Sequence, residues 1–144
     1  MELEQQVVSF ENAKRLKELN IRKESLFYWC EFKDKYCIPI KTKPYIIYGK
    51  RKWKKELLIS AFTVAELGEI LPTYLKEHAK KGISFSVETD GFCIFKRHFG
   101  WIVSYAQFSR SDKTLANAMA QMLILLIENK LYDPQNTQKT QTTV

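Results

Sequence analysis

Residues 112–131, with the sequence DKTLANAMAQMLILLIENKL, decide the fold class of this chain. Their apolar side chains recur at intervals of three and four, the spacing that places them on one wide face of an α-helix. The apolar positions are Ala116, Met119, Ala120, Leu123, Leu126 and Ile127. Ser111 or Asp112 supplies a side-chain oxygen suited to cap the first turn. We therefore predict a long core helix over about residues 113–129, against which the rest of the chain packs.

The residues that precede this helix predict antiparallel strands. Apolar and polar side chains alternate over residues 83–87, and Asp90-Gly91 then provides the positive φ angles that a tight hairpin turn requires. The elements expected next are a strand at residues 92–96, a turn at 98–100 and a strand at 101–108. Strand alternation places Trp101, Val103 and Tyr105 on one face of this sheet.

Three aromatic or branched runs in the first half of the chain predict further strands. They are residues 25–32 (SLFYWCEF), 45–48 (YIIY) and 56–62 (ELLISAF). Bulky aromatic and β-branched side chains suit a pleated, half-buried surface better than the surface of a helix. Because a polar, basic connection joins the second run to the third, we expect these two runs to form an antiparallel pair.

Two shorter helices are indicated by their capping residues. Ser9 precedes a helical apolar pattern over residues 10–19 and supplies a capping hydroxyl. Thr63 and Glu66 fit a capping box, in which each side chain accepts a hydrogen bond from a free backbone amide of the first turn. The second helix should end just before Pro72, because proline disfavours helical geometry in the residue that precedes it.

Length and composition predict one folded domain. The chain has 144 residues, of which 45% are hydrophobic and 27% charged, as in globular rather than disordered proteins. We predict a single α+β domain over residues 1–133, in which an antiparallel, aromatic-rich sheet packs against the long C-terminal helix and one or two shorter helices. Pro134 cannot continue a helix, and we expect residues 134–144 to form a disordered polar tail.

Cysteine usage and the N-terminal sequence predict a cytoplasmic protein. The three cysteines, Cys30, Cys37 and Cys93, are an odd number without the dense spacing of a secreted disulfide framework. The first residues contain no apolar export segment and no small-residue cleavage site. The longest apolar run, residues 122–127, is much shorter than the roughly 20 residues that cross a bilayer, so we expect no membrane association.

One segment accounts for the formal net charge of +7. The chain has 23 basic and 16 acidic residues, and residues 41–55 contain seven basic residues and no acidic one, which leaves the remainder neutral. We expect this segment to contact an anionic partner, a nucleic acid or nucleotide, with cations on phosphates and an indole stacked on a base. The candidate contact residues are Lys41, Lys43, Lys50, Arg51, Lys52, Trp53, Lys54 and Lys55. The alternative is a solvated loop whose lysines keep edge strands from pairing with other sheets.

A helix-turn-helix over residues 13–29 is a second way in which a basic chain could bind DNA. The first helix and the turn fit this motif, except that Asn20 stands where the turn usually has glycine. The segment that would form the recognition helix is aromatic, whereas base-reading side chains are polar. We therefore disfavour this motif.

The reactive side chains favour a protein that is not an enzyme and needs no metal or cofactor. His78 and His98 lack a metal-chelating spacing, and the five glycines form no phosphate loop or dinucleotide fingerprint. Cys93 and His98 are candidates for nucleophile and base, but their odd spacing directs them to opposite faces of a strand. We interpret Cys93 as a buried, small apolar residue. The carboxylates assigned to caps and turns are Glu66, Asp90 and Asp112, and those left over are Glu69 and Glu88.

Three blocks in a fixed order resemble a group of small proteins. The blocks are residues 9–29, 59–72 and 112–131. Together they resemble small uncharacterised proteins found in phages, prophages and other mobile elements of Bacteroidota. The resemblance implies a common fold and a bacterial host cytoplasm, and it implies no common site. The basic residues around Trp53 and the Gln/Thr-rich tail are not features of that group.

We therefore expect a non-catalytic binding protein of phage or mobile-element type that contacts an anionic partner through its Lys/Arg/Trp loop. The alternative is a protein-interaction or homo-oligomeric accessory module, for example one that acts on host defence through a host protein. Such a module would use an exposed aromatic sheet face, and the basic loop would serve solubility. Added salt separates the two, because phosphate contacts weaken steeply with salt and apolar interfaces do not.

Overall fold

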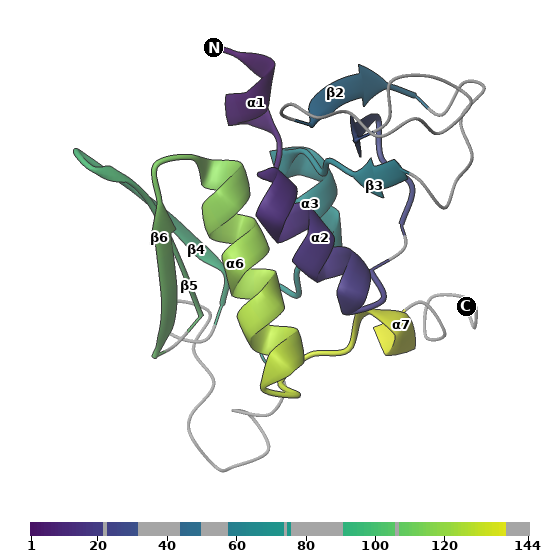
Figure 1. Cartoon of the computed structure of the whole chain (residues 1–144). Helices are drawn as coiled ribbons and strands as arrows, with labels where there is room; N and C mark the ends of the chain where they lie inside the picture. Colours follow the sequence, from purple (N-terminus) through teal and green to yellow (C-terminus); the bar gives the residue numbers. More distant parts are fainter. Residues whose placement is uncertain are drawn as a thin grey trace.

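The computed structural model describes residues 1–21, 23–31, 44–49, 58–73, 75, 91–105 and 107–137, and the structural statements that follow concern these residues. The helices are α1 (Leu3–Gln6), α2 (Phe10–Glu18), α3 (Val64–Ile70), α6 (Leu115–Glu128) and α7 (Pro134–Thr137). The strands are β1 (Phe27–Cys30), β2 (Tyr45–Tyr48), β3 (Leu58–Ser60), β4 (Cys93–Arg97), β5 (Gly100–Tyr105) and β6 (Phe108–Asp112). Figure 1 shows α6 between the sheet formed by β4, β5 and β6 on one side and helices α2 and α3 on the other. The predicted α+β class is confirmed.

Helix α6 is the central element of the core, as its apolar pattern predicts. Eight of its residues are buried, and they lie on more than one face because the helix is enclosed by a sheet and by two helices. The predicted cap at Ser111 or Asp112 is wrong, since both residues belong to strand β6. The cap is Thr114, whose hydroxyl accepts a hydrogen bond from the Asn117 amide. Asp112 supports the turn instead, because its carboxylate accepts hydrogen bonds from the Thr114 amide and from the Gln121 side chain.

The sheet beside α6 has the strand order β4-β5-β6, and all of its strands are antiparallel. The strand predicted at residues 101–108 is confirmed over residues 101–105, but its extension to residue 108 is wrong, because the chain reverses and begins β6 at Phe108. Trp101, Val103 and Tyr105 share the face that packs on α6, as predicted, and the last two are fully buried. The strand predicted at residues 83–87 and the turn residue Asp90 lie outside the described residues.

The second sheet has the strand order β2-β1-β3, with β1 in the centre. The expected pairing of residues 45–48 with residues 56–62 is therefore wrong, because β2 and β3 lie on opposite edges of β1. Both strands run antiparallel to β1, so they run parallel to each other. The reason is the burial of β1: a strand with interior side chains has to satisfy its amides and carbonyls on both edges, and it needs two neighbours.

The two shorter helices begin as their caps predict. The Ser9 hydroxyl accepts from the Asn12 amide at the start of α2. At the start of α3, Thr63 and Glu66 form the predicted capping box, and the helix ends at Ile70, two residues before Pro72. These ends depend on neighbouring residues alone, which is why the sequence predicts them well.

The larger of two hydrophobic clusters in the described residues joins the two sheets, and the smaller one is formed by Tyr28, Cys30 and Leu58. The larger cluster includes Trp29 from β1 and Val103 from β5, together with the inner faces of α2, α3 and α6. The Trp29 indole N–H donates a 2.9 Å hydrogen bond to the Val8 carbonyl, which ties β1 to the segment before α2. Residues 134–137, predicted to be disordered, form the helical turn α7 with Pro134 as its first residue, a position that proline favours. The rest of the predicted tail, residues 138–144, lies outside the described residues.

Candidate functional site

All eight predicted contact residues lie outside the described residues. They are Lys41, Lys43, Lys50, Arg51, Lys52, Trp53, Lys54 and Lys55. The described residues that flank them are Glu31 and Pro44 around the first group, and Gly49 and Leu58 around the second. The strand order changes the context of the second group, because residues 50–57 connect two parallel edge strands and not the two strands of a hairpin.

The strand register aligns the first residues of β2 and β3 at one end of the β2-β1-β3 sheet. Tyr45, Cys30 and Leu58 lie side by side across the three strands. The chain enters β2 at Tyr45, two residues after Lys43, and it enters β3 at Leu58, three residues after Lys55. The two entry points are separated by two strand spacings, or about 10 Å.

A described cation lies at the same end of this sheet. The Lys17 ammonium, on helix α2, donates a hydrogen bond to the Leu58 carbonyl at 3.4 Å. The opposite end of the sheet holds Tyr48, whose side chain is 68% exposed and whose ring meets Phe27 edge-on at 5.6 Å. From there Gly49, with a φ of 74°, takes the chain toward Lys50. The chain therefore leaves β2 at one end of this sheet and enters β3 at the other, and the second basic group lies between these two points in the sequence.

The histidine and cysteine considered as a catalytic pair lie at opposite ends of strand β4. Cys93 begins the strand, and His98 is in the turn that follows it, five residues and about 16 Å along the chain. A nucleophile and its base have to approach to about 3 Å, so these two side chains do not form such a pair. Cys93 is half-buried and not fully buried as predicted. His78, Glu88 and Cys37 lie outside the described residues.

The carboxylate of Glu66, which the sequence analysis assigned to a cap, has a structural role. The Glu66 carboxylate accepts hydrogen bonds from the Thr63 amide, the Leu26 amide and the Ser25 hydroxyl, so it joins the capping box to the segment before β1. Glu69 on the same helix is exposed. Within the described ranges no three His, Cys, Asp or Glu side chains come together as a metal site. None of the described helices is both long and apolar enough to span a bilayer.

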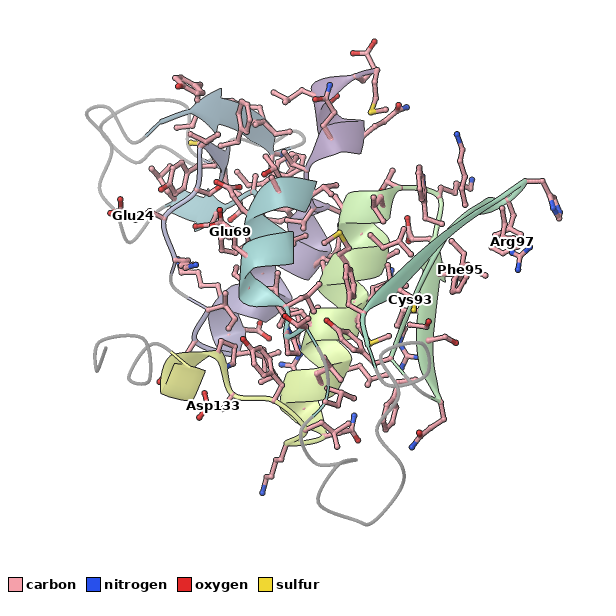
Figure 2. All side chains as sticks on the ribbon, turned by 180° about the vertical axis from the view of Figure 1, so that it is seen from behind. Glu24, Glu69, Cys93, Phe95, Arg97 and Asp133 are labelled. Carbon is pink, nitrogen blue, oxygen red and sulfur yellow. The ribbon has the colours of Figure 1, made fainter. Side chains whose placement is uncertain are left out.

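The β4-β5-β6 sheet has an outer face that the sequence analysis did not resolve into residues. The strand register places on it Cys93, Phe95, Arg97, Ile102, Ser104, Ser109 and Ser111. We call these residues the open sheet face. Figure 2 shows Phe95 and Arg97 on the side of the sheet away from α6. Residues 93–97 show no alternation of apolar and polar side chains that would have identified this face, and only the register shows which neighbours share it.

A groove of about 380 Å³ lies between the two sheets. Phe27 and Trp101 provide its aromatic walls, and the first residues of α3 and α6 and the segment around α1 complete it. The Lys96 ammonium lies 5.4 Å from the centre of the Trp101 ring, a distance at which a cation is attracted to the π face.

No protein-family model, curated protein or solved structure matches this chain. The resemblance to proteins of Bacteroidota mobile elements therefore stays a prediction.

Proposed function

We propose that this chain is a non-catalytic binding protein whose basic segment, residues 41–55, contacts an anionic partner, a nucleic acid or a nucleotide. The observation that carries the proposal is the distribution of charge: this segment holds the whole formal net charge of +7, and the rest of the chain is neutral. Such a concentration attracts polyanions and increases their rate of association. In the proposed setting, a protein of phage or mobile-element type meets this partner in the cytoplasm of a bacterial host.

The strand order supports the proposal, because it aligns the first residues of β2 and β3, and each of these strands follows a basic group in the sequence. Tyr45 and Leu58 lie two strand spacings, or about 10 Å, apart, and the Lys17 ammonium donates a hydrogen bond to the Leu58 carbonyl. Lysines at such spacing can each neutralise a phosphate of one strand and release its counterions. Trp53, inside the same segment, adds an indole on which a base can stack.

The test is fluorescence polarisation with labelled single-stranded and duplex oligonucleotides at about 50 and 200 mM salt. Wild type is compared with a basic-segment variant in which Lys50, Arg51, Lys52, Lys54 and Lys55 are replaced by Ser. A control variant loses the same charge from exposed positions elsewhere: Lys14, Lys23, Arg110, Lys113 and Lys130 become Ser. We expect salt-sensitive binding that the basic-segment variant loses and the control variant largely keeps. Equal affinities of the two variants would contradict the proposal.

A second candidate function is a protein-interaction or homo-oligomeric module, which the exposed aromatic side chains of the β4-β5 hairpin favour. Phe95 is 46% exposed and Phe99 50%. Exposed aromatic residues are enriched at the centres of protein interfaces. Light scattering across a concentration series tests self-association, and the same series on the Phe95→Ala variant shows whether this face is the contact.

A further inference from the structure

The open sheet face has the composition of a platform for a flexible polyanion. Its Phe95, Arg97, Ser109 and Ser111 side chains are exposed, and Figure 1 shows α6 packed on the other side of this sheet. None of the residues that the register places on this face carries a carboxylate. Its formal charge is therefore positive, from Arg97.

Phe95 lies in the middle of strand β4 and supplies an aromatic surface. Its cross-strand neighbour on β5 is Ile102, and the neighbour of Ile102 on β6 is Ser111. These three residues form one row across the sheet, with an aromatic ring at one edge, an aliphatic side chain in the middle and a hydroxyl at the other edge. The row is about 10 Å wide, two strand spacings. An unstacked base could lie on the ring while the hydroxyl reaches a polar edge of the nucleotide.

Arg97 lies two residues further along β4, on the same face and about 7 Å from Phe95 along the strand. Its partner across the sheet is Gly100, which has no side chain, so nothing on β5 covers the guanidinium from that direction. Gly100 has a φ of 142°, and a Cβ there would lie 2.3 Å from the Asp112 carbonyl oxygen, so the close approach of β6 requires glycine. Arg97 makes no ion pair with any residue in the described ranges, and its five N–H donors are available for a phosphate.

We propose that the open sheet face binds single-stranded nucleic acid, with a base stacked on Phe95 and the adjacent phosphate on Arg97. The inference rests on the proposed function for the class of partner, and it adds a contact surface on the other sheet. A single strand is the chemistry that fits, because stacking on Phe95 needs a base whose face is free, and a duplex buries those faces between neighbouring pairs. Exposed sheet faces with aromatic residues bind unpaired bases in this manner in other proteins.

The test uses a fluorescein-labelled, unstructured single strand of about 15 nucleotides and a duplex of the same length, read by fluorescence polarisation. The stacking variants are Phe95→Leu, which removes the ring, and Phe95→Tyr, which keeps it. We expect Phe95→Leu to weaken binding of the single strand by about 5- to 100-fold, and Phe95→Tyr to bind within about 3-fold of wild type. Phe95 is exposed, so both variants should unfold at the same temperature as wild type.

Arg97→Gln tests the phosphate contact against a matched arginine on the other face of the sheet. Arg110 is also exposed, but it lies opposite Val103 on the face toward α6, and its guanidinium donates to the Ser109 carbonyl. We expect Arg97→Gln to weaken binding by about 3- to 10-fold and to lower the salt slope by about one, and Arg110→Gln to have less than about 2-fold effect.

The outcomes separate this inference from the proposed function. If the basic-segment variant loses binding while Phe95→Leu and Arg97→Gln bind as wild type does, the open sheet face is not a contact and the basic segment is. If the basic-segment variant binds normally and Phe95→Leu does not, the sheet face is established and the proposed function is wrong. Equal affinity of all variants, or a dimer that Phe95→Leu dissociates without any nucleic-acid binding, would overturn the inference.

Discussion

The two sheets of this protein differ in how their central strands are buried. In β1, three consecutive side chains, Tyr28, Trp29 and Cys30, are all buried, so both faces of that strand are interior. In β5, burial alternates along the strand. Val103 and Tyr105 are fully buried, whereas Ile102 and Ser104, which precede them in turn, are only half-buried. A strand with two buried faces contributes to the core from both sides, whereas a sheet with one buried face leaves its other face toward solvent.

The largest effect should come from the strand with two buried faces. Trp29→Ala removes an indole that is 7% exposed and also its hydrogen bond to the Val8 carbonyl. We expect a loss of about 3–5 kcal/mol in the free energy of unfolding, measured by urea denaturation. Trp29→Phe keeps most of the ring and should cost less. A loss below about 1 kcal/mol for Trp29→Ala would contradict the burial of the face of β1 that carries Trp29.

Gly100→Ala should have the next largest effect, and it tests how tightly β6 approaches the β4-β5 turn. The added Cβ would lie 2.3 Å from a backbone oxygen of Asp112, and the φ of 142° is unfavourable for any residue with a side chain. We expect a loss of about 2–3 kcal/mol, because a backbone atom cannot move aside as a side chain does. Gly49→Ala is the matched control, since a Cβ there meets nothing within 4 Å and only its φ of 74° opposes the change.

The inner face of β5 predicts a loss of stability at alkaline pH. Burial raises the pKa of the Tyr105 hydroxyl above its ordinary value of 10.0, and this hydroxyl donates to the Pro72 carbonyl. The unfolded chain loses this proton above pH 10 and the folded chain keeps it, so stability is present below that pH and falls as the pH rises. We expect unfolding at about pH 11 to cost up to about 1.4 kcal/mol less than at pH 9 through this group. Tyr105→Phe should remove that part of the pH dependence, and an unchanged pH profile in the variant would contradict it.

The smallest effect on stability should come from the open sheet face. Phe95→Ala removes a ring that is 46% exposed, and no other aromatic ring in the described ranges stacks on it. We expect a change of less than about 1 kcal/mol in the free energy of unfolding, well below that of Trp29→Ala. A large loss would show that the ring packs against the protein, and it would remove the contrast between the two sheets.

Counting charged residues in the sequence predicts only part of the candidate site. The composition of residues 41–55 predicts where an anion would bind, because formal charge depends on residue type alone. The order of the strands that flank this segment depends on long-range pairing, and the observed order β2-β1-β3 contradicts the predicted hairpin. The open sheet face was foreseen only as an exposed aromatic face, because its members come from three strands and share that face through their register.

The sequence by itself determined the local structure: the central helix α6, the Ser9 cap, the capping box of Thr63 and Glu66, and the alternation of β5. These features depend on hydrogen bonds and apolar spacing among residues a few positions apart. Only the tertiary structure decided that residues 108–112 form a strand, which moves the cap of α6 to Thr114, and that β1 lies between β2 and β3. Strand pairing joins residues far apart in the chain, and its free energy depends on which faces are buried, so no local pattern specifies it.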